Sequence, residues 1–224
     1  MPTVLVLGAS RGLGREFVRQ YAAEGWRVLA TCRRAQDAAA LSPDCALVVE
    51  TDLLDARSPA QLAAALGEED LDVAIINAGV YGLATRGLEP PEAEEFDLVL
   101  RTNVLVAMRF IPQLGERLSA RDGRLAVISS RMGSIAGTSQ PFGWLYRASK
   151  AALNSVLKSA SVELGRQGVT CVSLHPGWVR TEMGGSGADL SPEQSVSAMR
   201  RVIASATASH NGRFLNFTGE HLEW

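Results

Sequence analysis

The chain has 224 residues, of which 46% are hydrophobic and 21% charged, and its formal net charge is −2. This balance is typical of one globular domain with a substantial core, and it gives no reason to expect nucleic acid or a membrane as a partner. The cysteines Cys32, Cys45 and Cys171 have no metal-ligand spacing, so we expect no metal site. No apolar run approaches the roughly 20 residues that cross a bilayer, and the N-terminus has no basic leader. We therefore expect a cytoplasmic, reduced protein.

Short apolar runs alternate with longer helical patterns along the chain. The runs predict strands over residues 4–7, 27–31, 46–49, 73–76, 125–128, 169–174 and 214–217, and most are continuously apolar, as in strands buried on both faces. Helical patterns occupy residues 13–24, 59–66, 93–118, 144–167 and 192–208. This alternation predicts an α/β fold, namely one doubly wound Rossmann domain over residues 1–224 with a mostly parallel seven-stranded sheet and helices on both faces.

The first predicted strand leads directly into a glycine-rich turn, residues 8–14 (GASRGLG), which opens the first helix. Gly8 permits a tight turn, Gly12 lets the backbone approach a pyrophosphate, and Gly14 lets the helix pack closely on the strand. The free N–H groups and the positive helix end favour phosphates. The spacing is G-x-x-x-G-x-G and not the commoner G-x-G-x-x-G, so a plain glycine turn remains the alternative to a dinucleotide site.

The second predicted strand ends at two arginines, Arg33 and Arg34, with no acidic residue beside them. A carboxylate here would bind the ribose 2′-hydroxyl of NAD, whereas an arginine accommodates the 2′-phosphate of NADP. Arg11, in the glycine turn, is placed to reach the same region. We therefore predict NADP(H) as the preferred cofactor, with NAD(H) as the alternative cofactor and two solvated arginines as the structural alternative.

Two further strand ends contribute polar groups. Asp52, after the third strand, is placed either to accept from the adenine amino group or to cap a helix. The turn at residues 77–79 ends the fourth strand, at the sheet edge where ligands bind in such folds. The residues expected at the cofactor from this half of the chain are Gly8, Ser10, Arg11, Gly12, Leu13, Gly14, Arg33, Arg34, Asp52, Leu53, Asn77, Ala78 and Gly79.

Tyr146 and Lys150 lie four residues apart in a predicted helix. That spacing puts the phenol and the ammonium on one face of the helix, a turn apart. A free tyrosine has a pKa of about 10, and a neighbouring cation lowers the pKa of a phenol toward the working range of an acid or base. Together with the glycine turn, the pair predicts a nucleotide site and a proton donor in one domain.

These motifs, in this order and over the whole chain, resemble the short-chain dehydrogenases/reductases. The segments that carry the resemblance are the glycine turn, residues 77–79, Asn103, Ser129-Ser130, Tyr146 with Lys150, and Pro176-Gly177 before Thr181. Residues 129–135, 175–185 and 211–214 are most similar to the branch of small carbonyl reductases that includes Sniffer and C-factor.

The resemblance implies an oxidoreductase that reduces aldehydes or ketones of small apolar molecules by hydride transfer from NADPH. Tyr146 would donate the proton, Ser130 would orient the carbonyl oxygen, and Lys150 would lower the pKa of Tyr146 and hold the nicotinamide ribose. Asn103 would support a water that links Lys150 to solvent. The implied cofactor contacts in this half of the chain are Tyr146, Lys150, Pro176, Gly177, Val179 and Thr181, with Val179 and Thr181 at the carboxamide.

Several of these residues have structural alternatives. Asn103 would also be explained if it satisfied a local backbone group. Only one of Ser129 and Ser130 is the catalytic hydroxyl, and we choose Ser130 because the family's serine stands three residues before the glycine that matches Gly133. His175 has no catalytic counterpart in the family, so we expect it to pack or to lie in an exposed loop.

The resemblance has departures and limits. Leu7 and Ile76 stand where the family usually has threonine and asparagine, although backbone contacts should preserve nucleotide binding. We expect Trp144 and Trp178 to line an apolar substrate site or the core. The short, glycine-containing segment 183–191 predicts an open pocket with little lid.

Assembly and alternative functions also follow from the pattern. The alanine- and valine-rich helices from Ala93 and Trp144, with the resemblance, predict a homodimer or homotetramer. A non-catalytic NADP(H)-binding sensor or signalling protein on the same fold is the main alternative, although it has no chemical need for Asn103, Ser130 and the Tyr146–Lys150 pair. A sugar-nucleotide epimerase would need a larger substrate domain than the residues after Thr181 provide.

Overall fold

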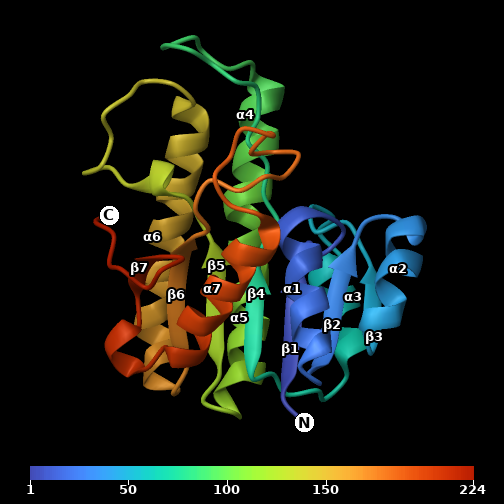
Figure 1. Cartoon of the computed structure of the whole chain (residues 1–224). Helices are drawn as coiled ribbons and strands as arrows, with labels where there is room; N and C mark the ends of the chain where they lie inside the picture. Colours follow the sequence, from blue (N-terminus) through green and yellow to red (C-terminus); the bar gives the residue numbers. More distant parts are fainter.

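All seven strands of the chain lie in one sheet in the computed structural model, which describes residues 1–224. The sheet has the order β3-β2-β1-β4-β5-β6-β7, and every neighbouring pair is parallel (Figure 1). The strands are β1 (Thr3–Leu7), β2 (Arg27–Cys32), β3 (Leu47–Glu50), β4 (Val73–Ile76), β5 (Arg124–Ile128), β6 (Thr170–His175) and β7 (Arg213–Asn216). The predicted α/β fold is confirmed, and the order reverses between β1 and β4, where such sheets bind ligands.

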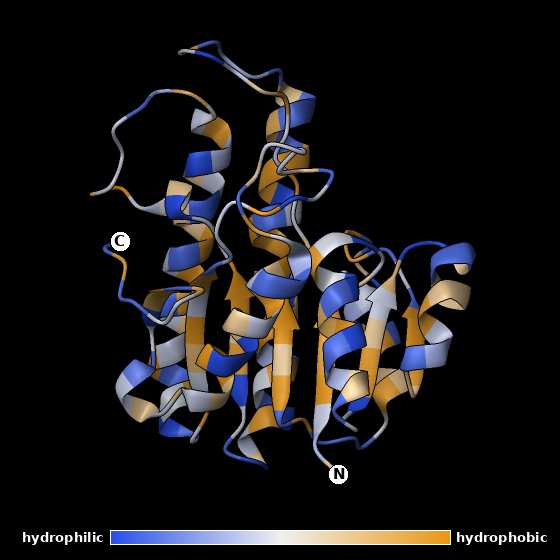
Figure 2. Cartoon of the chain, viewed as in Figure 1, coloured by the Kyte–Doolittle hydropathy of each residue, from blue (hydrophilic) through white to orange (hydrophobic).

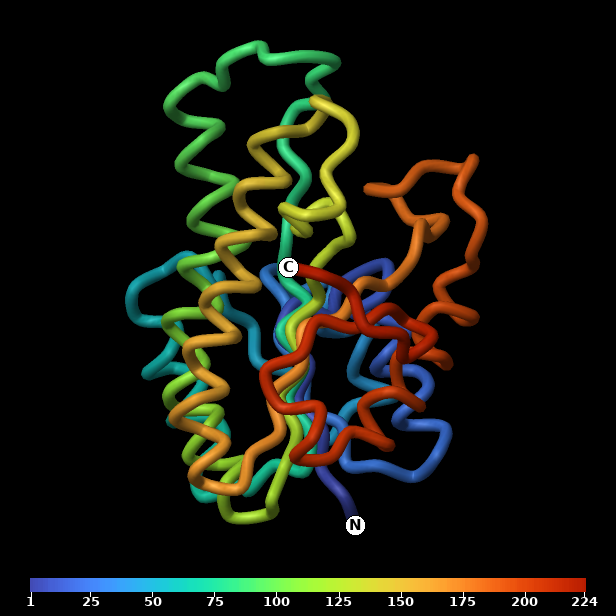
Figure 3. Tube along the Cα trace, turned by 90° about the vertical axis from the view of Figure 1, so that its left-hand side faces the viewer, coloured from blue at the N-terminus to red at the C-terminus, as the bar shows by residue number.

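Helices cover both faces of this sheet, as the view in Figure 3 shows. They are α1 (Gly12–Ala23), α2 (Ala35–Leu41), α3 (Ser58–Leu66), α4 (Ala93–Leu100), α5 (Val106–Ser119), α6 (Trp144–Arg166) and α7 (Pro192–Ser205). One apolar cluster joins the sheet to α1, α2 and α7, and a second joins it to α3, α5 and α6. The two layers follow from crossovers that return to a parallel sheet from either side.

The central strand β1 shows how the sequence divides between these two layers. Val4 and Val6 belong to the cluster with α1 and α7, whereas Leu5 and Leu7 belong to the cluster with α5 and α6. All four side chains are fully buried, since successive side chains of a strand point to opposite faces of the sheet. The strands therefore form the hydrophobic band of Figure 2, while the helices carry both hydrophobic and hydrophilic residues.

The predicted helix 93–118 is interrupted by a π-helical turn, Arg101–Leu105, between α4 and α5. The amide of Val106 bonds to the carbonyl of Arg101, a spacing of five residues. Asn103 lies in this turn and is buried. Isolated π-helical turns inside helices are frequent at functional sites, and nothing in the apolar pattern of the sequence indicated one here.

One helix was missed in the sequence, and the end of another is corrected. Helix α2 was not predicted, because its short, alanine-rich sequence (AQDAAAL) has no clear apolar period. The last helix ends at Ser205 and not at residue 208, and a separate short turn, Ala208–His210, follows. Neither difference changes the arrangement of the sheet.

Two further features of the described chain concern membranes and metals. None of its helices combines the length and apolar character that a membrane crossing requires. The three cysteines are free thiols, and no group of three or more His, Cys, Asp or Glu side chains is arranged to hold a metal ion.

Candidate active site

A cavity of about 680 Å³ opens at the carboxyl ends of the central strands, within the range of roughly 300–1,000 Å³ that is typical of ligand pockets. Its wall contains most of the predicted cofactor residues, namely Gly8, Ser10, Arg11, Gly12, Leu13, Arg33, Asp52, Leu53, Asn77, Ala78, Gly79, Tyr146, Lys150, Pro176 and Thr181. Other predicted residues lie off the wall, namely Gly14, Arg34, Asn103, Ser130, Gly177 and Val179. The fold thus brings the glycine turn and the Tyr146–Lys150 pair to one cavity.

The glycine turn connects β1 to α1 at one end of this cavity. Gly8 has φ +82°, and a Cβ there would lie 3.0 Å from the backbone of Ala78. A Cβ on Gly14 would lie 2.2 Å from the carbonyl oxygen of Gly8, so the close packing predicted for Gly14 is present even though it does not face the cavity. Helix α1 begins at Gly12 without a side-chain cap, which leaves N–H groups at its positive end available to an anion.

The two departures from the family pattern are explained by neighbouring strands. The amide of Gly8 donates to the hydroxyl of Thr31 on β2 at 3.0 Å, so Thr31 supplies the hydroxyl that Leu7 lacks. The side-chain amide of Asn77 donates to the carbonyl of Gly8 at 2.7 Å, which supports the turn without a polar residue at Ile76. Sequence reasoning missed Thr31, because its contact with Gly8 depends on the parallel pairing of β1 and β2.

The two arginines after β2 have different positions. Arg33 lies on the cavity wall, whereas Arg34 precedes α2 and pairs with Asp37 at 2.8 Å. The Arg34 guanidinium lowers the pKa of Asp37, and Arg33 and Arg11 add smaller contributions. An acid therefore does lie near these arginines, contrary to the prediction, although Arg34 balances the charge of Asp37. Arg34 is thus partnered within the protein, whereas Arg33 faces the cavity, and the contact of either with a 2′-phosphate stays a prediction.

Arg11 and Asp52 complete this end of the cavity. Arg11 forms an exposed ion pair with Glu182, which lies across the cavity mouth in the segment after Thr181. Asp52 lies on the wall and also accepts from the amide of Leu54 at 3.0 Å. This contact is a local turn and not a helix cap, and the wall position leaves the side of Asp52 that faces the cavity free for a ligand.

At the other end of the cavity, Tyr146 and Lys150 project from α6. Burial raises the pKa of Tyr146 to about 12, while hydrogen bonding with Ser130 lowers it and Tyr81 raises it further. Burial lowers the pKa of Lys150 to about 8. Lys150 Nζ donates to the carbonyl of Ile128 at 2.9 Å and lies 5.6 Å from the Tyr146 ring centroid. The expected lowering of the Tyr146 pKa by Lys150 is therefore absent from this geometry, because burial dominates.

The two serines after β5 face in different directions. Ser129 lies on the cavity wall, and its buried hydroxyl has no partner in the protein. Ser130 accepts from the amide of Met132 at 3.2 Å, and its hydroxyl lowers the pKa of the Tyr146 phenol against the larger effect of burial. A Cβ on Gly133 would lie 2.8 Å from the backbone of Lys150, so Gly133 brings the serine turn against α6.

Asn103 is bonded to the protein on both sides of its amide. Its Oδ1 accepts from the amide of Val80 at 2.8 Å, and its Nδ2 donates to the carbonyl of Val80 and the hydroxyl of Ser149, each at 2.9 Å. The Asn103 side chain therefore does satisfy backbone groups, as the structural alternative proposed. Those groups belong to Val80 in a distant loop and are not local ones. A Cβ on Gly79 would meet both Asn103 Oδ1 (3.2 Å) and Lys150 Nζ (3.3 Å), so these atoms border the same space.

The segment after Pro176-Gly177 extends toward the glycine turn. A Cβ on Gly177 would meet Leu190 and Phe217, and Val179 is buried and bridges to Leu190. Neither Gly177 nor Val179 lies on the cavity wall, and their cofactor contacts stay predictions. Thr181 does lie on the wall, and its methyl group would be 3.4 Å from a Cβ on Gly12. Of the segment 183–191 only Met183 lies on the wall, so the open pocket with little lid stays a prediction.

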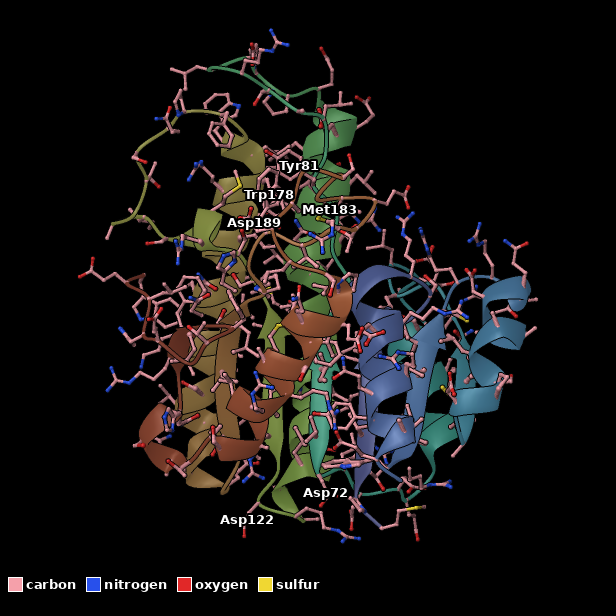
Figure 4. The ribbon with its side chains drawn as sticks, in the orientation of Figure 1. Asp72, Tyr81, Asp122, Trp178, Met183 and Asp189 are labelled. Atoms are coloured by element: carbon pink, nitrogen blue, oxygen red, sulfur yellow. The ribbon has the colours of Figure 1, made fainter.

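The aromatic wall of the cavity also differs from expectation. Neither Trp144 nor Trp178 lies on it; their indole N–H groups donate to the carbonyls of Glu89 and Gly184. Tyr81 and Met183 lie on the wall instead, and Figure 4 shows both above the carboxyl end of the sheet. No motif identified these two residues, since loops that are distant in sequence bring them here.

His175, at the end of β6, is held neutral at physiological pH. Burial, with a smaller contribution from Arg131, lowers its pKa to about 4, and its Nδ1 has no partner in the protein. The residue does not line the cavity. This position agrees with the expectation of a packing role and not with an acid.

Comparisons with known proteins identify the class. A profile of the short chain dehydrogenases matches residues 2–189, so the chain belongs to this oxidoreductase family. It is 39% identical over 156 residues to the C-signal protein of Myxococcus xanthus, covering 69% of this chain and 93% of that protein.

Solved structures extend the similarity over the full length. A carbonyl reductase from Pseudomonas aeruginosa PAO1 in complex with NADP is 36% identical, with a TM-score of 0.88 and 100% of both chains covered. The carbonyl reductase Sniffer of D. melanogaster is 29% identical, with a TM-score of 0.89 and the same coverage. The similarity to the small carbonyl reductases expected from the sequence is confirmed.

Proposed function

We propose that this protein reduces aldehydes or ketones of small apolar molecules, with NADPH as the hydride source and Tyr146 as the proton donor. The observation that carries the proposal is the convergence of the Tyr146 phenol, the Ser130 hydroxyl and the Lys150 amine beside one cavity. An acid and hydrogen-bond donors around one point stabilise a carbonyl oxygen as negative charge develops on it.

The opposite end of the cavity fits a dinucleotide phosphate. The uncapped start of α1 offers backbone N–H groups, and Arg11 and Arg33 carry positive charge on the same wall. The similar carbonyl reductase in complex with NADP supports the preference for NADP(H) over NAD(H). We assign the 2′-phosphate to Arg33 with Arg11, because Arg34 is engaged by Asp37.

The proton step follows from the environment of Tyr146. A pKa of about 12 keeps the phenol protonated at neutral pH, as a proton donor requires. Ser130 orients the carbonyl oxygen, and the carbonyl carbon would take its hydride from NADPH when the cofactor is bound. The oxygen takes the proton of Tyr146 and an alcohol forms. The phenolate that remains is reprotonated from solvent.

Lys150 and Asn103 are proposed to assist this return of the proton. The lowered pKa of Lys150, about 8, lets its amine exchange protons near neutral pH. Asn103 borders the same space as Lys150 Nζ, as a relay through a water molecule requires. Lys150 would also hold the nicotinamide ribose. Thr181 on the cavity wall would contact the carboxamide, and the buried Val179 would pack beneath Thr181.

The test is carbonyl-dependent oxidation of NADPH and, in parallel, NADH, across apolar aldehydes, ketones and quinones. We expect turnover with a preference for NADPH. Faster turnover with NADH would contradict the assignment of Arg33, and tight NADPH binding without turnover on any carbonyl would contradict the enzymatic proposal.

The Tyr146→Phe variant tests the proton donor directly. Loss of a general acid costs about 10²–10⁴-fold in rate, so we expect kcat to fall by at least that lower limit while the Kd for NADPH stays within about twofold. Because Phe keeps the ring and its burial, a large loss of NADPH binding would show that Tyr146 acts structurally. Full activity in the variant would refute the mechanism.

A non-catalytic NADP(H)-binding sensor or signalling protein is the second candidate. It is favoured by the 39% identity to a protein named C-signal. The two candidates differ in a single prediction, because only the enzyme loses turnover without losing cofactor affinity when the Tyr146 hydroxyl is removed.

Assembly and location are also proposals. Phe96 and Leu98 on α4, Met108 on α5 and Val162 on α6 are exposed apolar side chains, and their burial between copies supports a homodimer or homotetramer. Light scattering at several concentrations tests this, and a monomer at micromolar concentration would refute it. A cytoplasmic location remains a prediction from the sequence.

A further inference from the structure

Tyr81 lies in the loop between β4 and α4, and its ring packs against that of Tyr146. The ring centroids are 4.6 Å apart and the planes are inclined by 32°. Tyr81 lines the cavity and is half-buried, whereas Tyr146 is buried. Tyr81 thus covers one face of the Tyr146 ring and is the more exposed of the two rings; Figure 4 shows Tyr81 above the carboxyl end of the sheet. No role in the chemistry described above is assigned to it.

The hydroxyl end of Tyr81 reaches the start of the helix that carries Tyr146. Gly143 immediately precedes α6 and has φ +65°. A Cβ on Gly143 would lie 2.5 Å from Tyr81 Oη and 2.9 Å from Met132 Cε. The space beside Gly143 is thus filled by Tyr81, so the ring contacts both Tyr146 and the helix start that orients it.

The loop that carries Tyr81 is fixed at several points. Val80 forms two hydrogen bonds with the Asn103 side chain. The amide of Gly143 donates to the hydroxyl of Thr85 at 3.2 Å, and the indole of Trp144 donates to the carbonyl of Glu89 at 2.9 Å. These contacts join the loop to the start of α6, so the positions of Tyr81 and Tyr146 are coupled through the backbone as well as through their rings.

We propose that Tyr81 is a positioning residue for carbonyl reduction: its ring holds the Tyr146 ring in the orientation that directs the phenol to Ser130, and it excludes water from that side of the cavity. The inference rests on the proposed function, because it assigns a role toward the same proton donor. The ring is the active part of Tyr81, since aromatic rings in contact restrict each other's orientation.

The position of Tyr81 predicts in which direction the pKa of Tyr146 moves when the Tyr81 ring is removed. Burial raises the pKa of Tyr146 to about 12, and the charge of the Tyr81 phenol adds a smaller increase that both Tyr81→Phe and Tyr81→Leu would remove, so the two variants differ only in the burial of Tyr146. Loss of the Tyr81 ring admits water and lowers the pKa of Tyr146 toward the ordinary value of about 10. Reduction needs the protonated phenol, so the alkaline fall in kcat/KM for the carbonyl moves to lower pH.

The first experiment compares Tyr81→Phe with Tyr81→Leu. We expect Tyr81→Phe to keep kcat within about threefold of the wild type, and Tyr81→Leu to lose about 10- to 100-fold through misplacement of the phenol. The Kd for NADPH should stay within about twofold in both. The alkaline fall should occur at lower pH in Tyr81→Leu than in Tyr81→Phe; the same pH in both, or an equal loss of kcat in both, would overturn the proposal.

Two further variants separate positioning from general disruption of the loop. Leu83→Ala is the matched control, because Leu83 is 71% exposed and lies off the cavity wall, and it should leave kcat and the pH profile unchanged. Gly143→Ala introduces a methyl group against Tyr81 Oη and Met132 Cε and strains the backbone at φ +65°, so it should lower kcat. Addition of Tyr81→Phe should restore part of that loss; no restoration would count against the contact.

A readout without turnover distinguishes failure of this proposal from failure of the proposed function. Ultraviolet difference titration of each Tyr81 variant against the same variant carrying Tyr146→Phe isolates the ionisation of Tyr146. We expect a lower midpoint in Tyr81→Leu than in Tyr81→Phe, whether or not a carbonyl substrate has been found. Equal midpoints would overturn the role of Tyr81, whereas absence of carbonyl turnover in the wild type would overturn only the reaction.

Discussion

The two ends of the cavity differ in the groups that form them: the phosphate end depends on the backbone, and the chemical end depends on side chains. At the phosphate end the turn at Gly8 is held by backbone groups, with the Thr31 hydroxyl and the Asn77 amide as supports. At the chemical end the side chains of Tyr146 and Lys150 from α6 meet the Ser130 side chain from the turn after β5. The first end tolerates unusual residues because a neighbouring strand replaces a missing hydroxyl, whereas the second depends on individual side-chain atoms.

The largest effect expected at the phosphate end comes from Gly14→Ala. The added Cβ would lie 2.2 Å from the Gly8 carbonyl oxygen and 2.6 Å from Asn77 Nδ2, so the turn must move. We expect the free energy of unfolding to fall by about 3 kcal/mol and the Kd for NADPH to rise more than tenfold. Urea unfolding and fluorescence titration measure these effects. Gly87→Ala, where nothing lies within 4 Å, is the control, and unchanged NADPH binding in Gly14→Ala would show that the turn is flexible.

Arg33→Ala and Arg34→Ala test which arginine recognises the 2′-phosphate. A charge-assisted hydrogen bond contributes about 1.5–3 kcal/mol, so Arg33→Ala should reduce the preference for NADPH over NADH by about 10- to 150-fold. Arg34 already pairs with Asp37, so its removal should change the preference by less than about threefold. The ratio of kcat/KM for the two cofactors is the measurement, and the opposite ranking would contradict the assignment.

Lys150→Met tests how much the buried Lys150 amine at the chemical end lowers the free energy of unfolding. In the folded protein the pKa of Lys150 is about 8, below the value of about 10.4 in an unfolded chain. The unfolded state therefore binds more protons between these values, and stability should rise with pH from about 8 to 10, by about 2 kcal/mol at most. Urea unfolding should lose this rise in Lys150→Met and keep it in Lys158→Met, whose side chain is exposed. A rise of equal size in both variants would contradict the burial of the amine.

The smallest effect is expected for Glu182→Gln, at the mouth of the cavity. Glu182 pairs with Arg11 and adds negative charge near the proposed phosphate site. Exposed ion pairs contribute about 1 kcal/mol or less, so the Kd for NADPH should fall by at most about fivefold, and less at high salt. Weaker NADPH binding in this variant would mean that the ion pair holds the segment 180–190 in place for the cofactor.

The fold was predictable because the buried strands are continuous apolar runs, as in β1 and β4. The site was predictable where its chemistry lies in short motifs, as for Tyr146 and Lys150. The supporting contacts were not predictable, because Thr31 reaches Gly8 from the neighbouring strand β2 and Tyr81 reaches Tyr146 on α6 from the loop after β4. The pKa of Tyr146 was misjudged for the same reason, since burial depends on the packed structure and not on the spacing of residues.

The π-helical turn at Arg101–Leu105 has a consequence for any mapping of surfaces along this part of the chain. A hydrogen bond that spans five residues inserts one extra residue, which rotates the following helix by about 100° relative to an uninterrupted one. Residues of α4 and α5 at helical spacing therefore do not share a face. Cross-linking or scanning substitutions along residues 93–119 should be indexed separately before and after this turn, because a continuous helical wheel would assign the side chains of α5 to the wrong neighbours.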